Sequence, residues 1–264
     1  MSVHGLWTGQ SYYLADSYTN DAWWLDGQYT APPNLTLRDA TIGSVHTDNW
    51  WSGTLSTWGP STITDGVHVG AFSGFSINLQ RVGAIEIDGS SSVGYHTRFE
   101  VNGGGPYQQL TLNGTLALNA ASTVIHPDVV GNGNIVLVGH GSTELGGAVG
   151  SGETIWCLEG GLQIDQPQLL QGTIEGLGDG ITLKGLGGVA DAKLTATDFT
   201  FTSTLYNSDG TAAYTGAMDL HIRDTPYHQV VVRHAGGPDG GSVLLSAQTS
   251  PVGALPQSVI HQTA

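Results

Sequence analysis

Histidine is the residue type in this sequence with the broadest chemical potential, because imidazole binds metals and exchanges protons near neutral pH. The chain contains ten histidines. No two of them are separated by the two or four residues that place metal ligands side by side on a strand or a helix. His221, His228 and His234 fall on neighbouring predicted strands and could converge in space. Ordinary surface positions explain the set better, so the sequence predicts no transition-metal centre.

A short segment resembles half of a calcium-binding nonapeptide repeat. Residues 131–137 read Gly-Asn-Gly-Asn-Ile-Val-Leu, with asparagine where aspartate would carry charge, and no tandem array follows. Hard cations prefer oxygen ligands, and a formal net charge of −15 favours cation binding. The calcium candidates are therefore Asn132, Asn134 and Asp179, and we expect no other cofactor.

Acid–base and nucleophilic catalysis find little support in the residue pattern. There is no Asp-Asp pair, no Gly-x-Ser-x-Gly elbow and no phosphate-binding loop. The single cysteine, Cys157, lies in an apolar run, which predicts a buried and inert thiol. We expect no catalytic residues. A polysaccharide-active solenoid enzyme remains an alternative, because such a site can be assembled from carboxylates on distant coils.

Aromatic residues are concentrated at the start of the chain. Residues 1–60 hold six of the seven tryptophans, separated by polar and turn residues. This composition predicts a cap or interaction region, with two uses open: self-association, or a platform on which sugar rings stack. The candidates are Trp7, Trp23, Trp24, Trp50, Trp51 and Trp58.

Composition narrows the class of partner. Only 11% of the 264 residues are charged, and 22 acidic against 7 basic side chains give the net charge of −15. Nucleic acids are bound through basic side chains, so a nucleic-acid partner is not expected. No apolar run approaches the roughly 20 residues that span a membrane.

The elements that must position these residues are short strands. Residues 61–190 alternate apolar and polar positions in runs that end in Asn-Gly or Asp-Gly, and no stretch shows a helical period. Similar runs begin at Leu116, Ile135, Ile155 and Ile174, a nearly constant interval of about 20 residues. This repeat predicts a right-handed parallel β-solenoid, and a β-sandwich or jelly roll is the competing fold.

Three regions follow from these patterns. Residues 1–60 are predicted to form an irregular, aromatic-rich β region, residues 61–190 the solenoid, and residues 191–264 a set of C-terminal β-hairpins. Within the last region, residues 193–205 read as one long alternating strand. Residues 229–233 and 242–246 flank a glycine-rich turn, which predicts a hairpin.

Two segments carry a resemblance to a known family. Asn-Trp-Trp-Ser-Gly-Thr at 49–54, followed by Trp-Gly-Pro at 58–60, resembles the opening motif of bacterial autotransporter-like and adhesin-like β-solenoid proteins, as does Leu-Trp-Thr-Gly at 6–9. Residues 170–183 are similar to the glycine-rich coils of passenger-type repeats. The resemblance implies a secreted, bacterial surface protein and transfers no catalytic residue. Because residues 1–7 lack a signal-peptide pattern, we expect export without a cleaved N-terminal signal.

The function that we expect is structural. A solenoid has two ends whose last strands lack partners, so copies of the chain can pair end to end. We expect a self-associating subunit of an extracellular sheath, filament or biofilm matrix, with copies of itself as the main partner. The alternative is an adhesin that binds extracellular polysaccharide through its N-terminal Trp and Tyr residues.

Overall fold

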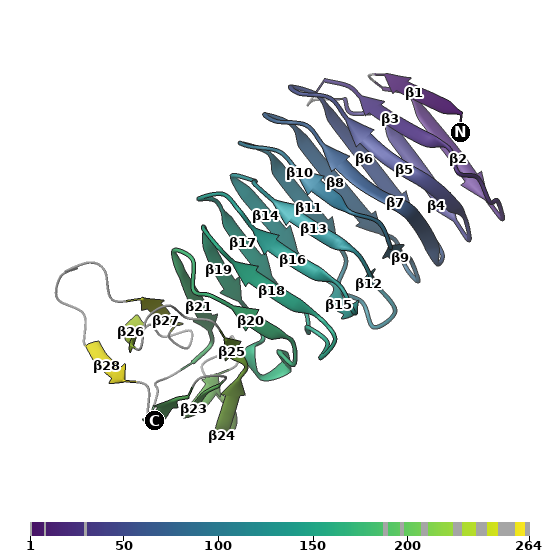
Figure 1. Ribbon diagram of the computed structural model, residues 1–264. Coiled ribbons are helices and arrows are strands. Elements are labelled where there is room, and N and C mark those ends of the chain that lie inside the picture. The colour runs from purple at the N-terminus through teal and green to yellow at the C-terminus, as the bar shows by residue number, and fades with distance from the viewer. Residues whose placement is uncertain are drawn as a thin grey trace.

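The computed structural model describes residues 2–7, 9–28, 31–186, 190–195, 198–206, 211–223, 229–235, 242–247 and 257–261. Parallel strands stack along one axis in about eight turns (Figure 1). The only helical element among the described residues is a 3-10 turn, Pro167–Leu169. The chain is therefore an all-β parallel solenoid, as predicted. A β-sandwich is excluded, since its strands pair antiparallel.

Two long sheets form the walls of the solenoid. In spatial order, sheet A contains β1 (Val3–Trp7), β3 (Ala22–Asp26), β5 (Thr41–Thr47), β7 (Ser61–Val69), β10 (Ser91–Val93), β13 (Thr115–Leu118), β16 (Asn134–Leu137), β18 (Thr154–Cys157), β20 (Thr173–Glu175) and β25 (Ile222–Arg223). A side branch of sheet A contains β9 (Ala84–Ile87), β12 (Gln109–Leu112) and β15 (Asp128–Gly131), so the middle coils have a third wall.

Sheet B faces sheet A across the core. In spatial order it contains β2 (Ser11–Ala15), β4 (Asn34–Arg38), β6 (Ser52–Thr57), β8 (Gly74–Leu79), β11 (Arg98–Asn102), β14 (Ser122–Ile125), β17 (Ser142–Leu145), β19 (Gly161–Ile164), β21 (Gly180–Lys184), β27 (Ser242–Ala247), β26 (Gln229–Ala235) and β28 (Gln257–His261). The turn that leads from a sheet A strand to the next sheet B strand is called the A-to-B corner below.

The core consists of columns of apolar side chains, one from each coil. Leu116 pairs with Ile135, Ile135 with Ile155, and Ile155 with Ile174. This register confirms the repeat that the sequence predicts, because each of these residues lies one coil after the last. All eight side chains predicted to point inward are buried: Leu116, Leu118, Ile135, Leu137, Ile155, Ile174, Ile181 and Leu183.

Glycine is required where one coil crosses closely over another. A Cβ atom at Gly141 would collide with the carbonyl oxygen of Ala120 on the preceding coil. Gly66 has a φ of +94°, and its Cβ would collide with the carbonyl oxygen of Ser90. Neither position accommodates a larger residue without moving backbone, which explains part of the high glycine content.

The solenoid begins earlier than the sequence predicts. β1 through β6 are regular parallel strands of the same two sheets, and β5 pairs with β7 across the expected boundary at residue 60. The N-terminal region is therefore part of the solenoid and not an irregular cap. Its coils are slightly longer than those of the middle, since Trp23 pairs with Val45 and Val45 with Val67.

The C-terminal region contains antiparallel strands, as predicted. β26 and β27 form the expected hairpin, and β27 pairs antiparallel with β21 of the last coil. Sheet C contains β22 (Ala190–Leu194), β23 (Phe199–Tyr206) and β24 (Ala212–Leu220). The single long strand predicted over residues 193–205 is instead two strands, because Thr195 and Asp198 form a turn between them.

Candidate functional site

Exposed aromatic rings stack along one edge of the solenoid. Trp50 and Phe72 lie face to face, with ring centroids 4.3 Å apart and planes 5° apart. Phe72 also contacts Tyr95 edge-on at 6.0 Å and His96 at 5.4 Å. These four residues, here called the aromatic ladder, come from the A-to-B corners of three successive coils. Trp50, Phe72 and Tyr95 are 71%, 43% and 54% exposed.

Backbone register places these rings above one another. The Trp50 amide donates to the Ala71 carbonyl, and the Phe72 amide donates to the Tyr95 carbonyl, both at 2.9 Å. Trp50, Phe72 and His96 all have left-handed backbone, with φ values of 69°, 56° and 54°. Bulky residues rarely adopt this conformation, so the three corners share an unusual geometry that presents rings outward.

A shallow groove lies on the outer face of sheet B, beside this ladder. It has a volume of about 210 Å³ and is lined by Pro32, Ser52, Gly53, Thr54, Gly74, Phe75, Ser76, Arg98 and Glu100. A second groove of about 190 Å³ lies farther along the same face and is lined by Ser122, Thr123, Val124, Ser142, Thr143, Glu144, Gly161, Leu162, Gln163 and Thr182. β11, which borders the first groove, pairs directly with β14, which borders the second.

The outer face of sheet B is polar and internally hydrogen-bonded. The Asn102 amide donates to the Asn78 side-chain oxygen at 3.1 Å, and the Ser56 hydroxyl donates to the Asn34 side-chain oxygen at 3.0 Å. The Arg98 guanidinium binds the Glu100 carboxylate through its Nε atom at 2.7 Å. Both members of that ion pair stay within the groove, so its local charge is balanced.

A second row of rings lies on the outer face of sheet A. Trp24 stacks on His46 at 4.7 Å, and His46 stacks on His68 at 4.9 Å. Burial and the neighbouring His68 lower the pKa of His46 below its ordinary value. The surroundings of His46 therefore favour its neutral form.

The six predicted tryptophans do not form one platform. Trp23 is only 3% exposed and stacks on His4 at 4.4 Å, so it belongs to the core. Trp50 and Trp51 lie at an A-to-B corner, whereas Trp58 lies on the opposite edge, between β6 and β7. Trp7 is exposed at the end of β1, and Trp24 is half-buried in the row on sheet A.

Sequence reasoning missed Phe72, Tyr95 and His96. Their positions carry one usable signal: Trp50, Phe72 and Tyr95 follow each other at nearly equal spacing, which matches the length of a coil in this part of the chain. Each also stands two or three residues before a sheet B strand. That spacing becomes informative only when the coil length is known.

The predicted calcium candidates are not brought together. Asn132 lies between β15 and β16, and Asn134 is the first residue of β16, where its side-chain oxygen accepts a hydrogen bond from Trp156 at 3.3 Å. Asp179 lies at an A-to-B corner instead, where its carboxylate is 3.3 Å from His140 Nδ1.

The structure brings together a group of metal-binding residue types that was not predicted from the sequence. Ligand atoms of Asp198, Asp219 and His221 lie within 4.8 Å of one another. The His221 Nδ1 atom is 2.7 Å from an Asp198 oxygen, so a hydrogen bond already accounts for that contact. His228 lies outside the described residues, so the convergence with His221 that the sequence left open is untested.

Two buried groups have strongly altered ionisation. Both carboxylate oxygens of Glu153 are buried and lack a hydrogen-bond partner of standard geometry. Burial raises the pKa of Glu153 to about 7, and a polar contact with the Gly133 backbone offsets only part of this rise. Burial also raises the pKa of the Cys157 thiol to about 12, as expected for an inert cysteine.

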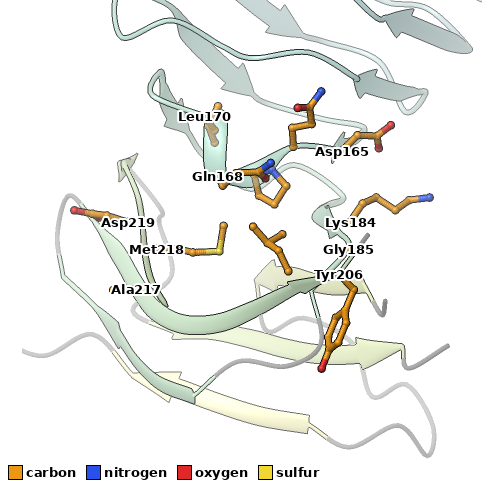
Figure 2. Close-up of a pocket in the computed structure, with 12 residues that line it drawn as sticks. Asp165, Gln168, Leu170, Lys184, Gly185, Tyr206, Ala217, Met218 and Asp219 are labelled. Atoms are coloured by element: carbon orange, nitrogen blue, oxygen red, sulfur yellow. The ribbon is translucent and has the colours of Figure 1, made fainter. Parts of the chain in front are cut away.

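A pocket lies where the last coil meets sheet C. Its volume is about 650 Å³, and Figure 2 shows Met218 projecting toward its middle while Asp219 projects away. Leu170 and Leu205 add apolar surface, and Lys184 is the basic side chain in the lining. Half of the lining residues are polar or charged, including Asp165, Gln166 and Tyr206, and this mixed lining does not by itself define a reaction.

The two ends of the solenoid differ. In the described part of the chain, β1 pairs only with β3, and β2 pairs only with β4, so each exposes one edge. At the other end, β25 and β27 cover β20 and β21. Sheet B then continues to β28, whose outer edge is unpaired among the described strands.

The fold and its surface define a class: a parallel β-solenoid with a polar grooved face and exposed edge strands. The sequence matches no known protein family, and no curated protein is similar to it. In the part of the chain that the structure describes, no helix has the length and apolarity that a membrane span requires.

Proposed function

We propose that this protein is a non-catalytic structural subunit that associates with copies of itself through its N-terminal end. The observation that carries the proposal is the pair of open edges on β1 and β2. Unpaired strand edges recruit other strands unless charge, proline or a covering element blocks them. Residues 1–15 contain no Asp, Glu, Lys or Arg, although the whole chain carries a net charge of −15.

Head-to-tail association is the arrangement that this geometry favours. Sheet B ends in β2 on one side and β28 on the other, and each is a five-residue strand with an open edge. β28, like β2, contains no Asp, Glu, Lys or Arg. Joining the two would continue sheet B from one copy to the next, and such a contact repeats without closing. The product is a filament.

An extracellular setting completes the proposal. The glycine-rich coils resemble those of bacterial surface proteins, whose role in sheaths and biofilm matrices fits a self-associating solenoid. Antibody labelling of intact producing cells tests this part. Labelling confined to permeabilised cells would contradict it.

A proline in the exposed edge tests the interface. The Asp16 amide donates to the Arg38 carbonyl and the Gln10 carbonyl accepts from Asn34, so even-numbered residues of β2 face β4. The amide of Tyr13 therefore faces the open edge. Tyr13→Pro removes that donor and keeps the internal ladder, as proline is tolerated on edge strands.

We expect the wild-type chain to form filaments visible by electron microscopy, and Tyr13→Pro to stay monomeric in light scattering with an unchanged circular dichroism spectrum. Tyr13→Phe is the matched control: it removes the hydroxyl, which interacts with Arg38, but keeps the amide. It should still assemble. A wild-type chain that remains monomeric at high concentration and in 0.5 M salt, where charge repulsion is screened, refutes the proposal.

A further inference from the structure

The two grooves on sheet B form one track along the solenoid axis. Ser52 pairs with Gly74, Gly74 with Arg98, and Arg98 with Ser122, so the lining residues of both grooves occupy the same register column. The neighbouring column runs through Thr54, Ser76, Glu100, Val124, Glu144, Gln163 and Thr182. Adjacent strands are about 4.8 Å apart, so the track repeats at that interval.

An apolar wall stands beside the first part of the track. Trp50 precedes Ser52 by two residues, and Phe72 precedes Gly74 by two. The aromatic ladder and the first groove therefore belong to the same coils and meet at the A-to-B corner. Large exposed apolar groups next to a polar surface mark interaction sites on soluble proteins.

The side chains of the track fit a hydroxylated polymer. Thr54, Ser76 and Gln163 supply donors and acceptors along one column, as a ligand with many hydroxyl groups requires. A sugar chain also has C–H faces, which pack against aromatic rings. The charged side chains in the first groove, Arg98 and Glu100, neutralise each other, and Glu144 adds negative charge to the second.

Two other ligand classes fit less well. Peptides that bind sheets pair with a free edge through their backbone, whereas this track runs across the face of sheet B, whose backbone groups are paired within the sheet. Polyanions are bound through clusters of basic side chains, which the track lacks, and the net charge of −15 repels them.

We propose that the outer face of sheet B binds a neutral polysaccharide chain laid along the solenoid axis, with the aromatic ladder as its apolar contact. This site is distinct from the open edges of β1 and β2. Binding and self-association can therefore be separated experimentally, and the monomeric Tyr13→Pro variant should retain binding.

Affinity electrophoresis tests the proposal. The probes are three neutral polymers, hydroxyethyl cellulose, laminarin and galactomannan, and two anionic ones, alginate and polygalacturonate. We expect at least one neutral polymer to retard the protein and neither anionic polymer to do so. Phe72→Asn and Ser76→Leu should each weaken retardation at least tenfold. Asparagine tolerates left-handed backbone, so the first variant removes a ring with little strain; the second fills the groove.

Tyr107→Asn is the matched control, because Tyr107 is equally exposed (71%, as for Trp50) but lies in the loop between β11 and β12, away from the track. It should bind as the wild type does. Circular dichroism and melting curves confirm that each variant is folded. The proposal is overturned if no neutral polymer retards the protein, if anionic polymers retard it equally, or if both track variants bind normally.

Discussion

Glu153 is a carboxyl group that the folded chain holds away from water without an ionic partner. Its pKa rises from 4.5 to about 7, so the folded state binds a proton more tightly than the unfolded state does. The stability that Glu153 contributes is therefore fully present below pH 4.5 and is lost as the pH rises from there through 7, by up to roughly 3 kcal/mol. Glu153→Gln is uncharged at every pH. We expect it to raise the free energy of unfolding at pH 8 and to leave it nearly unchanged at pH 4.

Urea denaturation at the two pH values measures this difference. A variant that is equally stabilising at pH 4 and pH 8 would mean that the effect comes from packing and not from ionisation. Glu144→Gln is a suitable control, because Glu144 lies on the partly exposed outer face of sheet B. It should give the same small change at both pH values.

His46 is expected to act in the opposite direction. Its pKa is lowered, chiefly by burial and then by His68, so the folded state favours neutral imidazole. Stability from this group is present above pH 6.5 and is lost as the pH falls below that value. His46→Gln loses ring stacking with Trp24 and should be less stable at pH 7.5. Between pH 7.5 and 5, however, its melting temperature should fall less than that of the wild type.

At the scale of single elements, the corner at Gly141 brings the backbones of two successive coils into close contact. Gly141→Ala introduces a Cβ that collides with the Ala120 carbonyl, and backbone has to move to relieve it. We expect a loss of roughly 1–3 kcal/mol, typical of overpacking. Gly104→Ala is the control, because nothing lies within 4 Å of the position of its Cβ. Thermal melts should show a fall for Gly141→Ala and no fall for Gly104→Ala.

The elements of the middle coils could be predicted because their length is nearly constant. Leu116, Ile135 and Ile155 recur at almost the same interval and do pair with one another. The first coils escaped the prediction because their repeat is slightly longer and because Trp23, an inward residue, was grouped with exposed tryptophans. The aromatic content of residues 1–60 suggested a separate region, whereas their strands belong to the same two sheets as the middle coils.

The candidate site was harder to predict than the fold. Phe72 contacts Trp50 from another coil, so no linear motif connects them. Their left-handed φ angles could not be predicted either, because glycine, the usual signal of that conformation, stands at neither position. The turn between β22 and β23 was missed for a related reason. Thr195 and Asp198 satisfy the backbone locally, and this competes with the alternating pattern that suggested one strand.

At the scale of the whole molecule, the coils should be removable as units. Deleting residues 135–154 joins Asn134 to Ile155, and Leu116 then pairs with Ile155 in place of Ile135. The apolar column stays continuous, and the sheet B strands β14 and β19 become neighbours. We expect this variant to fold cooperatively, with a circular dichroism spectrum like that of the wild type.

Deleting residues 135–153 is the sharper comparison. This deletion is one residue shorter, so Thr154 takes the inward position and every later side chain of the strand changes face. That variant should aggregate or remain unfolded. Equal stability of the two deletions would mean that columns of inward residues do not determine the register.

The pairing of Ile135 with Ile155, and of Ile155 with Ile174, also sets a rule for how such a chain can change over generations. Length can grow or shrink by whole coils, through duplication or loss of about twenty codons, while the stack adjusts simply by adding or omitting one layer. Smaller insertions survive at corners, where they lengthen a loop. Each coil gained or lost changes the length of the solenoid by about 4.8 Å, so the length of such a molecule is inherited in steps of that size.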